Sequence, residues 1–140
     1  MAEAKLEFDG VEVGDEAPVL THKLTRSDLV MYAGASGDFN PMHHDEVAAQ
    51  AAGLPSVFGH GMLSMGILGK AITDFVGIGN LKSYKVRFTK QTWPDEELTS
   101  KVVVTAKDHA DGAKLVTLEV SLANQNGELK VQGEAVAEAA

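Results

Sequence analysis

The residues best suited to chemistry gather in one segment, GASGDFNPMHHD, from Gly34 to Asp45. Asp38 lies in a glycine-flanked loop, and His43 follows it beyond an Asn40-Pro41 corner. Because proline restricts the backbone, this corner can aim a carboxylate and an imidazole at one small molecule such as water. A helix N-terminus disfavours imidazolium, so His43 is expected to stay neutral and able to accept a proton. The same two residues could instead have a structural role, in which they form hydrogen bonds within the loop and cap a helix. The pair alone does not distinguish the catalytic from the structural role.

A second group of interest is His60-Gly61-Met62. A glycine at the start of a helix lets a substrate approach the free backbone N–H groups there, and these groups can stabilise a carbonyl oxygen as negative charge develops on it. The simpler alternative is that Gly61 only begins a helix.

The spacing of other candidate residues argues against metal chelation, a serine nucleophile and dinucleotide binding. His43 and His44 are adjacent, so on a helix they point about 100° apart and chelate a metal poorly. Ser36 lacks the G-x-S-x-G context of a nucleophile elbow. Residues 77–79, Gly-Ile-Gly, lack the third glycine of a dinucleotide-binding loop. The sequence therefore predicts neither a metal site nor a dinucleotide-binding loop.

The amino-acid composition argues against several classes of protein. The chain has 140 residues, a formal net charge of −8 and no cysteine. An acidic surface is unsuited to nucleic acid, and disulfides and thiolate chemistry are excluded. The start, MAEAKLEFDG, has no apolar stretch typical of a signal peptide, and no run is long enough to span a membrane. We expect a single cytoplasmic domain over residues 1–140.

Four basic residues stand out in this acidic chain: Lys82, Lys85, Arg87 and Lys90. Such a group is usually a solvated strand face. It could also contact the phosphate of a carried substrate, with Lys85 and Arg87 as the candidates.

The first secondary-structure element predicted from the sequence is a strand over Val19–Leu24. Thr25 and Asp28 are spaced as a capping box, which predicts a short helix. Gly34 and Gly37 are expected to break it.

A second helix is predicted from the Asn40-Pro41 corner. Asn40 can cap it, and Pro41 suits its first position because the missing N–H is not needed there. His43 would lie in its first turn, and Gly53 with Pro55 would end it.

A third helix is predicted from about Gly61 to about Phe75. Nearly all its residues are apolar or small, so it should be buried on every side. Gly66 and Gly69 in its middle suggest that something packs close to its backbone. At this length it is too short for a membrane span.

Strands dominate the second half. Leu81–Thr89 alternates, with Tyr84, Val86 and Phe88 on one face. Further strands are predicted at Leu98–Lys107, at Leu115–Leu122 and after Leu129, joined by turns at Asp108–Gly112 and Asn126-Gly127. Helices early and antiparallel hairpins late predict an α+β fold in which a curved sheet wraps a central helix.

Two segments of the sequence resemble motifs of a known enzyme family. The run Gly37-Asp38-Phe39-Asn40-Pro41-Met42-His43 resembles the G-D-x-N-P-x-H motif of the MaoC-like (R)-specific enoyl-CoA hydratases and the related 3-hydroxyacyl-ACP dehydratases. Residues 59–63, Gly-His-Gly-Met-Leu, match the H-G-M-L segment of that family. The resemblance covers most of the chain, from about Val11 to Ala137, and implies the hotdog fold.

The resemblance also implies roles for individual residues. Asp38 and His43 would hold and activate the water that adds to a trans-2-enoyl thioester or leaves a (3R)-hydroxyacyl thioester. The Gly61 N–H would polarise the thioester carbonyl, and Asn40 and Pro41 would form the scaffold of the corner. The chain would then be a hydro-lyase of fatty-acid, polyketide or hydroxyalkanoate metabolism that needs no cofactor.

The resemblance implies partners as well. The substrate would be an acyl-CoA or acyl-ACP thioester, and the chain would form a homodimer or, second, a heterodimer with a sister hotdog subunit. Two alternative functions remain open: a hotdog acyl-thioesterase, and a subunit that is active only with its partner. Acyl chain length, carrier and physiological direction cannot be read from the sequence.

Overall fold

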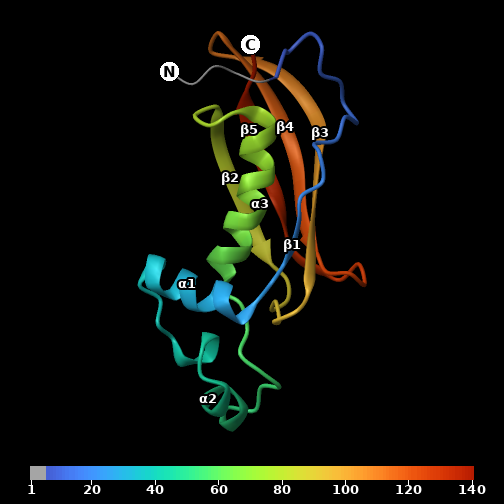
Figure 1. Ribbon diagram of the computed structural model, residues 1–140. Coiled ribbons are helices and arrows are strands. Elements are labelled where there is room, and N and C mark those ends of the chain that lie inside the picture. Colours follow the sequence, from blue (N-terminus) through green and yellow to red (C-terminus); the bar gives the residue numbers. More distant parts are fainter. Residues whose placement is uncertain (1–5) are drawn as a thin grey trace.

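The chain folds into a curved antiparallel sheet that wraps one long helix (Figure 1). The computed structural model describes residues 6–140, so part of the segment behind the signal-peptide prediction lies outside the described residues. The strands are β1 (Thr21–Lys23), β2 (Leu81–Phe88), β3 (Glu97–Ala110), β4 (Ala113–Ala123) and β5 (Leu129–Glu138). The helices are α1 (Arg26–Ser36), the 3-10 helix η1 (Pro41–His43), α2 (Glu46–Ala51) and α3 (Gly61–Val76).

The sheet has the strand order β1-β3-β4-β5-β2, with every neighbouring pair antiparallel. The two predicted hairpins form its centre, where Val120 of β4 lies opposite Val102 of β3 and Gly133 of β5. Within residues 6–140, β2 pairs only with β5 and is therefore an edge strand. This architecture confirms the predicted α+β fold with a sheet around a central helix.

The strand ends differ in detail from the prediction. β3 continues to Ala110, so the turn is formed by Asp111 and Gly112 alone and not by residues 108–112. Both turn residues have positive φ, 50° and 79°, as a tight two-residue hairpin turn requires. The polar residues before them therefore stay in the strand pairing. β1 begins only at Thr21.

The first helix is capped as predicted but ends later. Thr25 Oγ1 accepts a hydrogen bond from the Asp28 amide at 3.1 Å, and Asp28 Oδ2 accepts one from the Thr25 amide at 2.9 Å. α1 then continues through Gly34, so the expected break there is wrong. The helix ends at Gly37, which has φ of 78° in the left-handed region.

The second predicted helix is two elements. Asn40 and Pro41 open η1, which is only three residues long. His44 leaves helical geometry (φ −141°), and Asp45 begins the new helix α2 by accepting a hydrogen bond from the Ala48 amide at 3.1 Å. The placement of His43 in the first turn of an α-helix is therefore wrong.

The helix α3 spans the predicted range, and one face of it packs on the concave side of the sheet (Figure 1). Leu68, Ile72 and Val76 are fully buried in the main apolar cluster. Each such side chain contributes about 1.5–3 kcal/mol to stability by its burial. Near Gly69 the Tyr84 ring packs 3.4 Å from where a Cβ would lie, and the Tyr84 hydroxyl donates to the Met65 carbonyl at 2.7 Å.

The opposite face of α3 is not covered by the described residues, so the expectation of burial on every side is wrong for this single chain. Met62 is 58% exposed, and no described atom beyond its chain neighbours and the surrounding helix backbone lies within 4 Å of where a Cβ of Gly66 would be. No helix in the described part of the chain is long and apolar enough to cross a membrane.

Candidate active site

The corner between Asp38 and His43 is held by its own side chains. Asn40 Oδ1 accepts a hydrogen bond from the Met42 amide at 3.1 Å, and Pro41 occupies the first position of η1. Asp38 Oδ1 accepts a hydrogen bond from the Asn40 amide at 3.3 Å. The loop is therefore a rigid turn in which each side chain satisfies a neighbouring backbone group.

His43 has its tautomer set by one backbone carbonyl. The residue is buried, and its Nδ1 lies 2.6 Å from the Phe58 carbonyl oxygen. A carbonyl only accepts hydrogen bonds, so Nδ1 donates and Nε2 keeps the lone pair in the neutral ring. The Phe58 amide donates in turn to the Met42 carbonyl at 3.1 Å. His43 thus has the predicted proton-accepting nitrogen, but the cause is the hydrogen bond to the Phe58 carbonyl and not the N-terminus of an α-helix.

Asp38 faces this free nitrogen. Its Oδ2 lies 3.9 Å from His43 Nε2. This distance is too long for a direct hydrogen bond, but a single water can bridge a gap of this size. The Asp38 side chain is 52% exposed, so a small molecule can reach the pair. We call Asp38 and His43 the dyad.

His60 lies against both members of the dyad, and the sequence analysis assigned it no role. It is 2% exposed, its ring stacks on the His43 ring at 3.9 Å between centroids, and its Nε2 lies 3.1 Å from the Asp38 carbonyl oxygen. Burial lowers the pKa of His60, more than the hydrogen bond to the Asp38 carbonyl raises it. One signal was available in the sequence, because histidine is an unusual residue at a helix N-cap.

Gly61 is the first residue of α3, as predicted. No side chain of the described residues caps this helix, so its first-turn N–H groups are not occupied by a capping oxygen. The Phe88 ring lies 3.3–3.5 Å from where a Cβ of Gly61 would be. The helix N-terminus therefore opens onto a space that an aromatic ring covers from one side.

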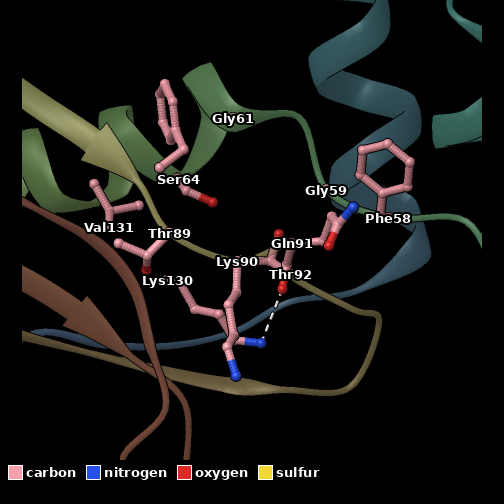
Figure 2. Close-up of a pocket in the computed structure, with 11 residues that line it drawn as sticks. Phe58, Gly59, Gly61, Ser64, Thr89, Lys90, Gln91, Thr92, Lys130 and Val131 are labelled. Atoms are coloured by element: carbon pink, nitrogen blue, oxygen red, sulfur yellow. Dashed lines mark hydrogen bonds between the residues drawn. The ribbon is translucent and has the colours of Figure 1, made fainter.

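This space is a pocket of about 380 Å³ between the first turn of α3 and the segment that follows β2 (Figure 2). Ser64 lies on the helix side and Lys130 on the strand side. The dyad is not among the lining residues, but Phe58 lines the pocket and also contacts the His43 ring at 4.8 Å between centroids. Residues 58–60 thus contact both the pocket and the dyad.

The pocket wall depends on a buried lysine that the sequence analysis did not single out. Lys130 has no exposed side-chain surface, and its Nζ donates to Glu128 at 2.7 Å and to the Gln91 carbonyl at 2.8 Å. It also forms an ion pair with Glu96 at 3.0 Å, so the buried ammonium is balanced by two carboxylates. The adjoining Thr92 carbonyl accepts from the Gly59 amide at 2.8 Å, which ties this wall to the chain leading into α3.

The basic residues lie apart from the dyad. Lys85 and Arg87 are on the face of β2 opposite Tyr84 and Val86, which pack toward the core. Lys82 and Lys90 are engaged with carboxylates, at 3.0 Å from Glu138 and 3.1 Å from Glu128 respectively. The structure therefore does not bring Lys85 and Arg87 to the candidate site within this chain, and their contact with a carrier phosphate stays a prediction.

The donor atoms of Asp38, His43 and His60 lie within 4.8 Å of one another, close enough to be considered as metal ligands. The sequence prediction of no metal was based on His43 and His44, and His44 instead contacts the Phe39 carbonyl at 3.1 Å. One ring nitrogen of each histidine is already engaged with a backbone carbonyl, that of Phe58 for His43 and that of Asp38 for His60. Metal independence stays a prediction.

Comparison with known proteins identifies relatives with named activities. The (R)-specific enoyl-CoA hydratase of Aeromonas caviae is 30% identical over 132 residues, which cover 90% of this chain and 93% of that protein. The 3-hydroxyacyl-thioester dehydratase Y of Mycobacterium tuberculosis is 39% identical over 80 residues, which cover 54% of this chain. This chain spans only 28% of the length of the mycobacterial protein and smaller shares of the next two curated relatives.

The fold agrees with these relatives over almost the whole chain. The structure of R-hydratase PhaJ1 from Pseudomonas aeruginosa superposes with a TM-score of 0.86 and 28% identity, covering 99% of this chain and 88% of that one. Residues 12–126 match the MaoC like domain family, and this range includes the corner, the dyad and all of α3. The chain therefore belongs to the MaoC-like dehydratase family, with the hotdog fold of its (R)-hydratase members.

Proposed function

We propose that this chain catalyses the reversible hydration of trans-2-enoyl thioesters, the reverse reaction being dehydration of (3R)-hydroxyacyl thioesters. One observation carries the proposal: the Asp38 carboxylate and the free Nε2 of His43 face each other across 3.9 Å, next to the uncapped start of α3. Membership of the MaoC-like family and the names of its relatives support the same chemistry.

In hydration, the oxygen of a water bonds to C3 and a proton is added at C2. Electron density moves to the thioester oxygen as the C3–O bond forms. A backbone N–H aimed at that oxygen stabilises the charge, and we assign this role to Gly61. The first-turn dipole of α3 acts in the same direction.

The dyad handles the protons. Neutral His43 and ionised Asp38 both present acceptors, so each can accept a hydrogen bond from a water held between them. The proton that the dyad removes from this water is the one returned to C2. One water therefore supplies both groups that are added, and no cofactor takes part. Asn40 and Pro41 serve as the scaffold that keeps the two acceptors opposed.

We propose a homodimer as the working form. The edge strand β2 and the uncovered face of α3 are continuous with the pocket, and Met62 and Phe88 are exposed there, at 58% and 48%. In such a pair, a second copy would cover the apolar face, and a heterodimer with a sister subunit would do the same. Lys85 and Arg87 are proposed to meet the phosphate of a CoA or ACP carrier.

The deciding assay uses purified protein and crotonyl-CoA. We expect the absorbance of the enoyl thioester to fall and to recover when 3-hydroxybutyryl-CoA of R configuration is supplied. Release of free thiol without reversible loss of the double bond would instead indicate a thioesterase. Activity of the single chain would exclude the need for a different partner subunit.

A further inference from the structure

The His60 side chain contacts both members of the dyad, through a ring stack with His43 and a hydrogen bond to the Asp38 carbonyl. We propose that His60 is a positioning residue that holds Asp38 and His43 opposite each other. This inference rests on the proposed function, because the dyad is its premise. It concerns the His60 side chain alone, whereas the oxyanion role belongs to the backbone of the next residue.

The contact with Asp38 is directional. The Asp38 carbonyl can only accept, so His60 Nε2 carries the proton and donates across 3.1 Å. The other hydrogen bonds described for Asp38 join it to Ser36 and Asn40, its neighbours in the loop. The bond from His60 joins Asp38 to the start of α3, 22 residues away in sequence. It is therefore a long-range contact that holds Asp38 against the start of this helix.

The contact with His43 sets the plane of the imidazole. The two rings are 26° from parallel at 3.9 Å, while the Phe58 ring meets His43 edge-on at 75°. The ring of Tyr32 packs on the edge of His60 at 4.8 Å. His43 is thus held between two rings and a carbonyl, with its Nε2 3.9 Å from Asp38 Oδ2.

The position of His60 favours function over local stability. It is the N-cap residue of α3, yet its side chain does not cap the helix. Its Nδ1 is buried and has no hydrogen-bond partner among residues 6–140. A serine or aspartate here would cap the helix and stabilise it. The imidazole instead crosses to the dyad and leaves the helix N–H groups free.

Protonation of His60 would disrupt this arrangement. A second proton would sit on the unpartnered Nδ1, and the positive charge would lie against His43 and near His44, with only Asp38 nearby to offset it. Burial lowers the pKa of His60, which agrees with a neutral ring in the working site. Tyr32 is the other titratable side chain packed against it.

Three substitutions separate the two contacts. His60→Ala removes both, His60→Gln keeps an amide donor for the Asp38 carbonyl, and His60→Phe keeps the ring face. We expect His60→Ala to lower kcat for crotonyl-CoA by at least about tenfold, and each of the other two variants to recover part of it. His44→Gln is the matched control, because His44 also donates to a loop carbonyl at 3.1 Å but is exposed and does not contact the dyad.

The readouts distinguish positioning from a general structural role. In His60→Ala, the acidic limb of the kcat/KM profile should move to lower pH. The Asp38 carboxylate would no longer be held beside the His43 imidazole and would therefore stabilise the protonated imidazole less. The Kd of the saturated analogue butyryl-CoA should stay within about twofold of the wild-type value.

Two results would overturn the inference. One is near-native kcat and an unchanged pH profile in all three His60 variants, with the wild type active. The other is a parallel loss of Tm, butyryl-CoA binding and kcat with the acidic limb unmoved. A wild-type protein that binds butyryl-CoA but never hydrates crotonyl-CoA would refute the proposed function itself.

Discussion

Replacement of Gly61 by alanine should lower the activity while it keeps or raises the stability of the protein. Gly61 is in the first turn of α3 and does not have a positive φ, so alanine fits its backbone conformation. Glycine in a helix costs about 0.5–1 kcal/mol relative to alanine. The new methyl group would meet the Phe88 ring at 3.3–3.5 Å, which is tight. Phe88 is 48% exposed at the end of an edge strand and can shift by the few tenths of an ångström required.

The free energy of unfolding should therefore stay unchanged or rise by up to about 1 kcal/mol. Activity should fall, because the methyl group occupies the space through which a thioester oxygen must approach the N–H. Loss of one oxyanion donor typically costs about 10²–10³ in rate. At 1.36 kcal/mol per factor of ten, a fall of about 10² in kcat/KM corresponds to about 2.7 kcal/mol of lost transition-state stabilisation.

The assay pairs urea unfolding with crotonyl-CoA hydration for Gly61→Ala and for Gly34→Ala. Gly34 is an exposed position inside α1, and no described atom beyond its chain neighbours and the surrounding helix backbone lies within 4 Å of where a Cβ would be. The control should gain similar stability and keep its kcat/KM. Normal kinetics in Gly61→Ala would remove Gly61 from the site. A loss of stability that matches the loss of activity would trace the effect to the Phe88 contact.

Further predictions concern the dyad, the pocket wall, pH and metals. Asp38→Asn and His43→Ala should each lower kcat by at least about 10² with an unchanged circular dichroism spectrum, the scale of acid–base residues; near-native turnover in either would remove that residue from the dyad. Lys130→Met should destabilise the protein by about 3 kcal/mol in urea, because it leaves buried carboxylate unpaired, whereas Lys90→Met on an exposed pair should cost under about 1 kcal/mol; equal midpoints would contradict this. Because burial lowers the pKa of His60 in the folded protein, the unfolded chain takes up that proton first, so stability should fall as pH drops below about 6.5; His60→Phe should show a shallower slope, and an equal slope would assign the effect to other groups. Dialysis against EDTA should leave kcat unchanged, and a loss restored by Zn²⁺ would show that the site needs a metal.

Local signals in the sequence predicted most of the fold. The Thr25–Asp28 capping box and the glycine after Asn126 act over a few residues, so their structures follow from short-range hydrogen bonds and backbone sterics. The start of the second helix was misjudged although its signal was also local. Asp45 is a good N-cap residue, and it restarts the helix that Asn40 was expected to begin.

Contacts between distant segments could not be predicted in the same way. The His60 imidazole reaches Asp38 only because residues 52–60 return the chain across η1, with the Phe58 amide bonded to the Met42 carbonyl. Lys130 is buried because strand pairing brings two glutamates and a loop carbonyl around it. No periodicity along the chain encodes either arrangement, since both depend on which segments the sheet places side by side.

The positions that break local rules are concentrated around one end of α3. His60 stands where a capping side chain would stabilise the helix, and Gly61 where alanine would be better. The buried atoms His60 Nδ1 and Thr92 Oγ1 have no hydrogen-bond partner among the described residues. An isolated exception of this kind would need only a local explanation, but these three residues lie around one helix end and each has a cost in stability. Natural sequences retain such costs where function requires them, and here each one keeps donors, space or a ring available to a substrate. The arrangement of these exceptions is therefore independent physical support for placing the reaction between the start of α3 and the dyad.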